Sequence, residues 1–213
     1  MSIGSCRGEE RKRKIVAEYD IRPLFHIKMI EGQDVLEGCC GKVSDRYYHF
    51  EATSKVTKDV ESFVVGYDCA EQLLDMAELE YLPLFNPLSH KGSGSGSGSG
   101  GSQQVKSGVN GKASMAPLNK ELSDAIHLLC MSWKGVPRGR LLSSLDFIRR
   151  LPGIPTKNFS IVGLNEVIAK DIRQRTLAQM IDDLRKQSPG LRSFEFPLMQ
   201  QVLVMEKKVS LLS

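Results

Sequence analysis

The stretch from Gly92 to Ser102, with the sequence GSGSGSGSGGS, divides this sequence into two parts. Gly and Ser side chains bury almost no apolar area, so folding gains too little to offset the conformational entropy lost when such a stretch is ordered. We therefore predict a flexible linker over residues 92–114, between one module of residues 1–91 and another of residues 115–213. The near-perfect alternation is typical of an engineered linker that joins two polypeptides. Natural low-complexity sequence is the alternative.

The two parts carry opposite charge. Residues 1–91 contain 12 Lys and Arg against 16 Asp and Glu, whereas residues 92–213 contain 17 against 9, which gives net charges of −4 and +8. This asymmetry predicts one of two arrangements: the acidic module binds the basic one, or the basic module binds phosphate groups of a nucleic acid.

Two further features concern the cellular setting. The sequence has no apolar stretch near the roughly 18 residues that cross a bilayer, and its basic N-terminus leads into no apolar segment. Its five Cys are an odd number and Cys39 and Cys40 are adjacent, which does not suit the disulfide framework of a secreted domain. We expect an intracellular protein, cytoplasmic or nuclear, that is not secreted and has no membrane partner.

The N-terminal module is predicted to contain strands followed by one helix. Apolar and polar side chains alternate over residues 25–29 and 47–52, and a third apolar run covers residues 63–65. Asp68 to Glu71 has the spacing of a capping box, so we expect a helix to begin at Asp68 or Cys69. Pro83 and Pro87 cannot continue it. The expected fold class is α+β, with a small antiparallel sheet and one helix before the linker.

The tail of this module is apolar and rich in Pro, a composition typical of a segment that lies across another surface. We expect it to bind the second module or another protein, through Tyr81, Leu82, Leu84, Phe85 and Leu88.

Cys69 is expected in the first helical turn, where the helix dipole favours a thiolate. Residues 36–76 resemble a treble-clef or zinc-ribbon module. In this resemblance Gly38-Cys39-Cys40-Gly41-Lys42 is the zinc knuckle, the next two strands are the hairpin, and Val65 to Ala70 leads into the ligand-bearing helix. A knuckle of this kind normally supplies Cys-x-x-Cys, and here position 37 is Glu.

The resemblance implies zinc as a cofactor, and a tetrahedral zinc site needs four ligands. The predicted ligands are Cys39, Cys40 and Cys69, with the fourth from His49, His26 or Cys6; His49 is the one included in the predicted set. The alternative is that Cys40 and Cys69 are simply small, buried apolar residues.

If the protein is an enzyme, Cys69 is the candidate nucleophile and His49 or His26 is the candidate base that removes its proton. The sequence contains no Gly-rich phosphate loop, no Gly-x-Ser-x-Gly and no His-Glu-x-x-His. We therefore predict that the protein is not an enzyme.

The C-terminal module is predicted to be mainly α-helical. Apolar residues recur at helical spacing over residues 118–133, 141–150 and 164–187, and each segment is followed by Pro or Gly. Beyond them, Phe194 and Phe196 alternate with polar residues and Val202 to Met205 is a β-prone run, so a terminal β-hairpin is expected.

Residues 118–206 resemble a winged helix-turn-helix, in which one helix enters the major groove of DNA. Ile168-Ala169 and Thr176-Leu177 are similar to the residues that flank its turn, but only three residues separate Ile172 from Thr176, so one continuous helix is the alternative. The resemblance implies a nucleic-acid partner. The expected phosphate contacts are Arg173, Arg175, Arg185, Lys186 and Arg192. The alternatives are a solvated helix face or a protein interface.

These observations favour a non-enzymatic interaction protein in which two mutually binding modules are tethered, as in an adaptor, an inhibitor or a regulatory pair. The second hypothesis is a nucleic-acid-binding regulator that acts through the basic helical module. The third is a thiol enzyme that uses Cys69.

Overall fold

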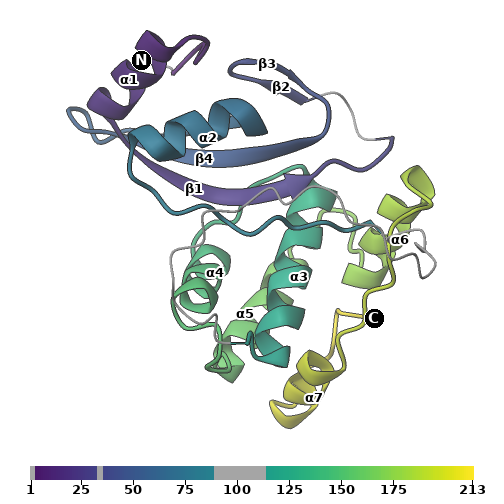
Figure 1. Cartoon of the computed structure of the whole chain (residues 1–213). Coiled ribbons are helices and arrows are strands. Elements are labelled where there is room, and N and C mark those ends of the chain that lie inside the picture. Colours follow the sequence, from purple (N-terminus) through teal and green to yellow (C-terminus); the bar gives the residue numbers. More distant parts are fainter. Residues whose placement is uncertain (1–2, 33–35, 89–113) are drawn as a thin grey trace, which may run out of the picture. The chain divides into compact units, whose positions relative to one another are not determined.

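A computed structural model describes residues 3–32, 36–88 and 114–213 (Figure 1). The predicted α+β class is confirmed: a small antiparallel sheet comes first and a mainly helical region follows. Two compact units result. One comprises Met1–Pro87, Cys130–Pro137 and Ile181–Leu191, and the other comprises Leu88–Leu129, Arg138–Met180 and Arg192–Ser213. All of the predicted linker except residue 114 lies outside the described residues, and the module boundaries at residues 91 and 115 stay a prediction.

The N-terminal sheet contains three strands, β1 (Tyr19–Lys28), β4 (Arg46–Ser54) and β5 (Val60–Gly66). Their order is β1-β4-β5 and both pairs are antiparallel. These strands contain nearly all of the three segments whose apolar alternation predicted them.

Two helices pack against one face of this sheet, α1 (Glu9–Glu18) and α2 (Tyr67–Met76) (Figure 1). Alternate residues of β4 point to that face, where they form the core with Leu73 and Leu74 of α2 and Ile15 of α1; they are Tyr48, Phe50 and Ala52. Burying each large apolar side chain contributes about 1.5–3 kcal/mol, so this core is the main source of stability for the sheet.

The start of α2 differs in detail from the prediction. The helix begins at Tyr67 with Gly66 at the N-cap, and no side chain caps its backbone N–H groups. The predicted capping box from Asp68 to Glu71 is therefore wrong. Glu71 instead accepts a hydrogen bond from the Tyr67 hydroxyl. Cys69 lies in the first turn, as predicted.

The segment after α2 runs beside β1. Phe85 forms a parallel bridge with Ile27, its N–H donates to the His26 carbonyl, and its own carbonyl accepts from Lys28 N–H. The carbonyl of Leu82 accepts a hydrogen bond from the Tyr48 hydroxyl. The outer strand β1 is thereby paired with a later part of the same polypeptide.

The second half is helical, as predicted. Its helices are α3 (Pro117–Trp133), α4 (Arg140–Arg150), α5 (Asn158–Ile168), α6 (Leu177–Gln187) and α7 (Pro197–Met205). The predicted helices at residues 118–133 and 141–150 correspond to α3 and α4. No helix within the described residues is long and apolar enough to span a bilayer.

Residues 164–187, for which the sequence left open one continuous helix or a helix-turn-helix, contain the end of α5 and all of α6. Thr176 and Gln179 form a capping box, since Thr176 Oγ1 accepts from Gln179 N–H and Gln179 Oε1 accepts from Thr176 N–H. Before it, the Asp171 carboxylate accepts hydrogen bonds from the backbone N–H and the guanidinium of Arg175. These local hydrogen bonds end one helix and start the next.

The predicted terminal β-hairpin is wrong, because Pro197–Met205 is the helix α7. Pro197 lies in its first turn, where a missing N–H costs nothing. The carboxylate of Glu121, on α3, accepts hydrogen bonds from Leu198 N–H and Met199 N–H. A β-prone sequence thus becomes helical because Pro and a distant carboxylate stabilise a helix N-terminus.

Candidate metal centre

Cys39 and Cys40 form the two-residue turn of a small hairpin between β2 (Leu36–Gly38) and β3 (Gly41–Val43). The flanking glycines are required by geometry. A Cβ on Gly38 would lie 2.9 Å from the Val64 carbonyl oxygen, and Gly41 has a φ of +124°. The hairpin can therefore lie close to β5, and the Cys39 N–H donates to the Val64 carbonyl at 2.8 Å.

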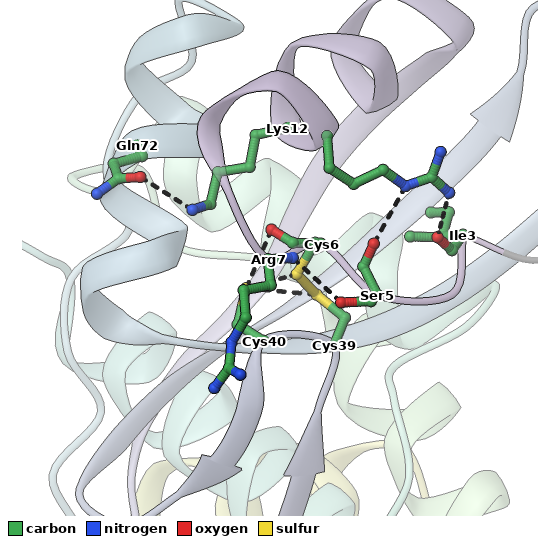
Figure 2. Close-up of a disulfide and its surroundings, with 9 residues drawn as sticks. Ile3, Ser5, Cys6, Arg7, Lys12, Cys39, Cys40 and Gln72 are labelled. Atoms are coloured by element: carbon green, nitrogen blue, oxygen red, sulfur yellow. Dashed lines mark hydrogen bonds between the residues drawn. A yellow bond between two sulfur atoms is a disulfide. The ribbon is translucent and has the colours of Figure 1, made fainter.

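Cys6 reaches this turn from an N-terminal arm, residues 3–8, which precedes α1. Its N–H donates to the Cys39 carbonyl at 3.0 Å. The arm is also fixed at Ile3, whose N–H donates to the Glu61 carboxylate and whose carbonyl accepts from Arg11 (Figure 2). Ile3 and Cys6 are fully buried in the core between the sheet and its helices.

Three sulfur atoms gather where the arm meets the hairpin. The Sγ atoms of Cys6, Cys39 and Cys40 all lie within 4.8 Å of one another, a group that could hold a metal ion. Cys40 Sγ is 2.7 Å from Cys6 Sγ and 4.0 Å from Cys39 Sγ. Cys6 and Cys39 are joined by a disulfide, with their Cα atoms 5.2 Å apart (Figure 2).

Cys69 adds a fourth sulfur from the first turn of α2. Burial raises the pKa of the Cys40 thiol to about 12, and the nearby side chain of Cys69 acts in the same direction. The structure thus brings together Cys39 and Cys40 of the predicted ligand set with Cys6, one of the alternatives for the fourth ligand. Cys69 lies near Cys40 but is not part of this group of three sulfurs.

Two cationic side chains lie beside the sulfurs. Lys12, on α1, is only 3 % exposed, and Arg7 lies on the arm. The positive charges of both act to lower the pKa of Cys40, against the larger effect of burial. Lys12 Nζ donates to Gln72 Oε1 at 2.9 Å (Figure 2). Sequence reasoning missed both residues, because the basic run that includes Lys12 is also typical of a solvated surface.

The two histidines proposed as ligands lie elsewhere. His49 alternates with the core-facing Tyr48 and Phe50, so it projects from the opposite face of the sheet. Burial lowers its pKa to about 4. His26 hydrogen-bonds through Nδ1 with the Leu82 carbonyl, and its ring stacks on Tyr48 with centroids 4.2 Å apart. The structure brings neither into the group of sulfurs.

The predicted interface residues differ in how deeply they are buried and in the contacts that they make. Phe85 is buried beside β1, and Leu82 is half-buried and accepts hydrogen bonds through its carbonyl. Tyr81 and Leu84 are exposed, and Leu88 is half-buried. The Tyr81 hydroxyl donates to the Asp75 carboxylate.

Most of the predicted phosphate-binding cations lie beside carboxylates. Arg185 pairs with Asp182 and Lys186 with Asp183, at the surface. Arg175 makes a largely buried ion pair with Asp171. Arg173 is exposed. These ion pairs reduce the positive charge that is available to a nucleic acid.

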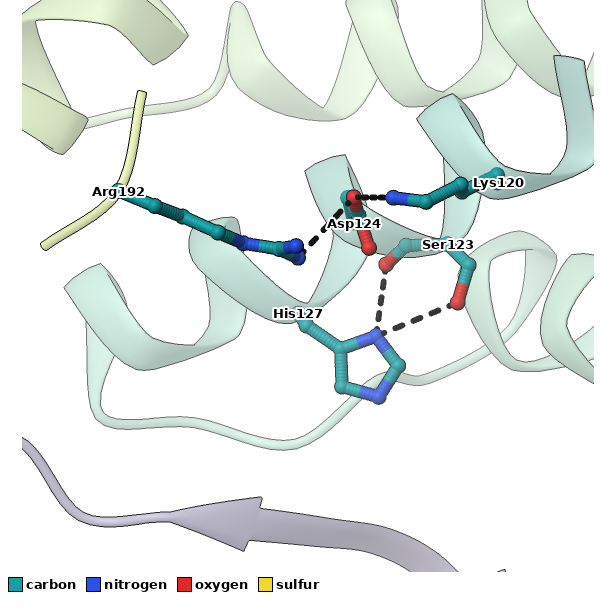
Figure 3. A network of polar contacts seen from close by, with 5 residues as sticks. All are labelled: Lys120, Ser123, Asp124, His127 and Arg192. Carbon is teal, nitrogen blue, oxygen red and sulfur yellow. Dashed lines mark hydrogen bonds and ion pairs between the residues drawn. The ribbon is translucent and has the colours of Figure 1, made fainter. Parts of the chain in front are cut away.

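Arg192, the fifth of these cations, belongs to a polar network on α3 (Figure 3). Its guanidinium donates to Asp124, which also accepts from Lys120, and it lies over the Phe194 ring. One turn further along α3, His127 hydrogen-bonds through Nδ1 with the Ser123 carbonyl at 2.6 Å. Burial lowers the pKa of His127 to about 4.

Comparison with known families adds one finding. A family model described as uncharacterised conserved protein UCP028583 matches residues 4–208. The chain belongs to this family. The match includes the three clustered cysteines, Cys69 and both parts of the chain, so the two parts occur in one family and in this order. No curated protein and no solved structure gave a significant match.

Proposed function

We propose that this protein is a non-enzymatic zinc-binding protein in which Cys6, Cys39, Cys40 and Cys69 bind one structural zinc ion. The observation that carries the proposal is the group of three cysteine sulfurs from the arm and the β2–β3 turn, with Cys69 of α2 near Cys40 as the candidate fourth ligand. Zinc bound there would join these segments, and the protein would act by binding a partner rather than by catalysis.

The chemistry of the donors supports zinc. Four thiolates are the ligand set of closed, structural zinc sites, in which each Zn–S bond is about 2.3 Å and neighbouring sulfurs are therefore about 3.8 Å apart. The 4.0 Å between Cys39 Sγ and Cys40 Sγ is close to that spacing. Cys6 and Cys39 would bind as thiolates, with their disulfide reduced.

The charges around the cluster give separate support. Zinc with four thiolates has a net charge of −2. A buried ammonium costs several kcal/mol unless an anion compensates for it, and within the described residues the Lys12 ammonium hydrogen-bonds only to the neutral Gln72 amide. A zinc–thiolate centre beside Lys12 and Arg7 would supply the missing negative charge.

The enzyme alternative lacks a base. A nucleophilic Cys69 needs a neighbouring group that removes its proton. In the described part of the chain no hydrogen bond joins Cys69 to His26 or His49, and the side chain that contacts it is that of Cys40. The arrangement therefore favours a ligand role for Cys69.

Zinc stoichiometry tests the proposal. We expect one zinc per chain, by elemental analysis, when the full chain is purified under reducing conditions without chelator. Cys69→Ser and Cys6→Ser should each lower the zinc content. Cys130→Ala, which removes a buried thiol of α3, should leave it unchanged.

Substitution of cobalt(II) for zinc provides a second readout that does not depend on the folding of a variant. A tetrahedral thiolate site gives intense visible and charge-transfer absorption. Zinc well below one per chain, or a cobalt spectrum without thiolate bands, would refute the proposal.

A further inference from the structure

We infer that Cys6 and Cys39 form a redox switch that releases the zinc: as thiolates they bind the metal, and as a disulfide they cannot. This inference rests on the proposed zinc site and concerns its regulation. It starts from the fact that the same two sulfur atoms take part both in a disulfide and in the group that could hold a metal.

The backbone suits both states. The Cα atoms of Cys6 and Cys39 are 5.2 Å apart, inside the range of about 4.4–6.8 Å that a disulfide needs. The hydrogen bond from Cys6 N–H to the Cys39 carbonyl fixes this separation whether or not the sulfurs are bonded. Oxidation therefore needs small side-chain movements, with no rearrangement of the arm or the hairpin.

The two states differ in which segments they join. Zinc bound to four cysteines would link the arm, the β2–β3 turn and α2. The disulfide links the arm to the turn, and leaves Cys40 and Cys69 as free thiols. Two remaining ligands do not make a closed zinc site. Oxidation would thus detach α2 from the cross-link while the arm stays attached.

The reaction balances with a peroxide as oxidant. The Cys6 thiolate attacks one oxygen of hydrogen peroxide and becomes a sulfenic acid as hydroxide leaves. The Cys39 thiolate then attacks Cys6 Sγ, the S–S bond forms, and a second hydroxide leaves. Two electrons pass from the sulfurs to the peroxide, both hydroxides take up protons to become water, and the zinc departs as Zn²⁺.

The position of Cys40 defines the competing product. Its sulfur is 2.7 Å from Cys6 Sγ, so it could attack there and exchange the bond to Cys6–Cys40. In the structure Cys40 Sγ instead donates a hydrogen bond to the Cys6 carbonyl and is a free thiol. The expected product of oxidation is therefore the Cys6–Cys39 bond.

The test uses the full chain loaded with zinc. Hydrogen peroxide is added in steps while a metallochromic indicator measures released zinc and mass spectrometry maps the disulfides. We expect one zinc released for each Cys6–Cys39 disulfide formed, and recovery of bound zinc when a phosphine reductant and zinc are added. The Cys130→Ala chain should behave identically.

The outcomes separate this inference from the zinc proposal. A reduced chain that binds no zinc refutes both. Three other outcomes refute the switch alone, in a chain that does bind zinc. In the first, zinc leaves as a Cys6–Cys40 bond forms, and in the second, zinc leaves without any disulfide. In the third, zinc stays bound when the Cys6–Cys39 bond forms. For a second measurement, hydrogen exchange at the N-terminus of α2 should rise on oxidation, whereas exchange at the β2–β3 turn should change little.

Discussion

The two halves of this protein fasten their irregular segments by different chemistry. In the first half, the arm and the β2–β3 turn are joined through cysteine sulfurs. In the second half, hydrogen bonds of side-chain amides and carboxylates hold the irregular segments in place. Asn119, fully buried, donates to the carbonyls of Pro152 and Ile154 and accepts from Thr156 N–H.

Asn165 is a second example from the helical half. Its amide donates to the Val209 carbonyl and accepts from Leu211 N–H, which fixes the C-terminal segment against α5. Hydrogen bonds of this kind are insensitive to metals and oxidants. The comparison therefore separates a half on which metals and oxidants would act, through its cysteines, from a half whose fastening hydrogen bonds they would leave unchanged.

The largest expected effect comes from substituting Asn119, whose side-chain amide makes the three hydrogen bonds described above. Asn119→Ala should lower the free energy of unfolding by about 4 kcal/mol, because a fully buried side chain loses three hydrogen bonds and the buried Thr156 N–H is left without its acceptor. Urea unfolding measures the loss, and zinc content should not change. Asn158→Ala, which removes one exposed hydrogen bond to Glu206, is the matched control and should cost little. A loss of zinc in N119A would contradict the proposal that zinc binding in the first half is independent of the hydrogen bonds in the second half.

Acid should weaken the helical half through His127. Its folded pKa of about 4 lies below the unfolded value of about 6.5, so the folded state binds fewer protons. The stability it contributes is complete above pH 6.5 and is lost as the pH falls towards 4, about 3 kcal/mol in total. Urea unfolding at several pH values measures this slope. His127→Gln should flatten it, and an unchanged slope in that variant would assign the effect to other groups, such as His49.

A smaller effect is expected at the cluster itself. Lys12→Met should weaken zinc binding about tenfold, because it removes a buried positive charge beside the thiolates. Competition with a chelator measures the affinity. Lys12→Arg should restore most of it, whereas Lys14→Met, an exposed substitution on the same helix, should leave it unchanged. Equal affinities in K12M and the parent would mean that the ammonium does not compensate for charge there.

The smallest effect concerns surface ion pairs of α6. The double substitution Arg185→Ala and Lys186→Ala should change the free energy of unfolding by less than about 0.5 kcal/mol, since both pairs are exposed. Urea unfolding again provides the measurement. A change above about 1 kcal/mol would reveal a structural role for these cations that their contacts do not explain.

Local patterns predicted much of the fold. Alternation identified the three main strands, and helical spacing identified α3 and α4, because both signals come from residues near each other in sequence. The failures came from distant partners. The β-prone run at Val202 becomes helical since Glu121, on another helix, caps it. No local pattern indicates that carboxylate.

The candidate site divides in the same way. Cys39, Cys40 and Cys69 were predicted from a knuckle followed by a hairpin and a helix, an order visible in the sequence. Cys6 was one of three choices for the fourth ligand, because its partner Cys39 is 33 residues away and spacing says nothing about such a pair. The helix-turn-helix resemblance placed a turn between Ile172 and Thr176, where α5 and α6 separate, whereas the apolar stripe that continues across it favoured one helix; the capping box of Thr176 and Gln179 was not recognised.

The pairing of the outer strands has a consequence for self-association. An uncovered outer strand offers free N–H and C=O groups on which strands of other molecules can assemble. Here Phe85 pairs with β1, while Cys39 and the arm, at Ile3, hydrogen-bond to β5. The link at Cys6 holds that arm in place. Loss of the hairpin contact at Cys39, which bonds to the β5 backbone, would therefore uncover β5 and favour aggregation.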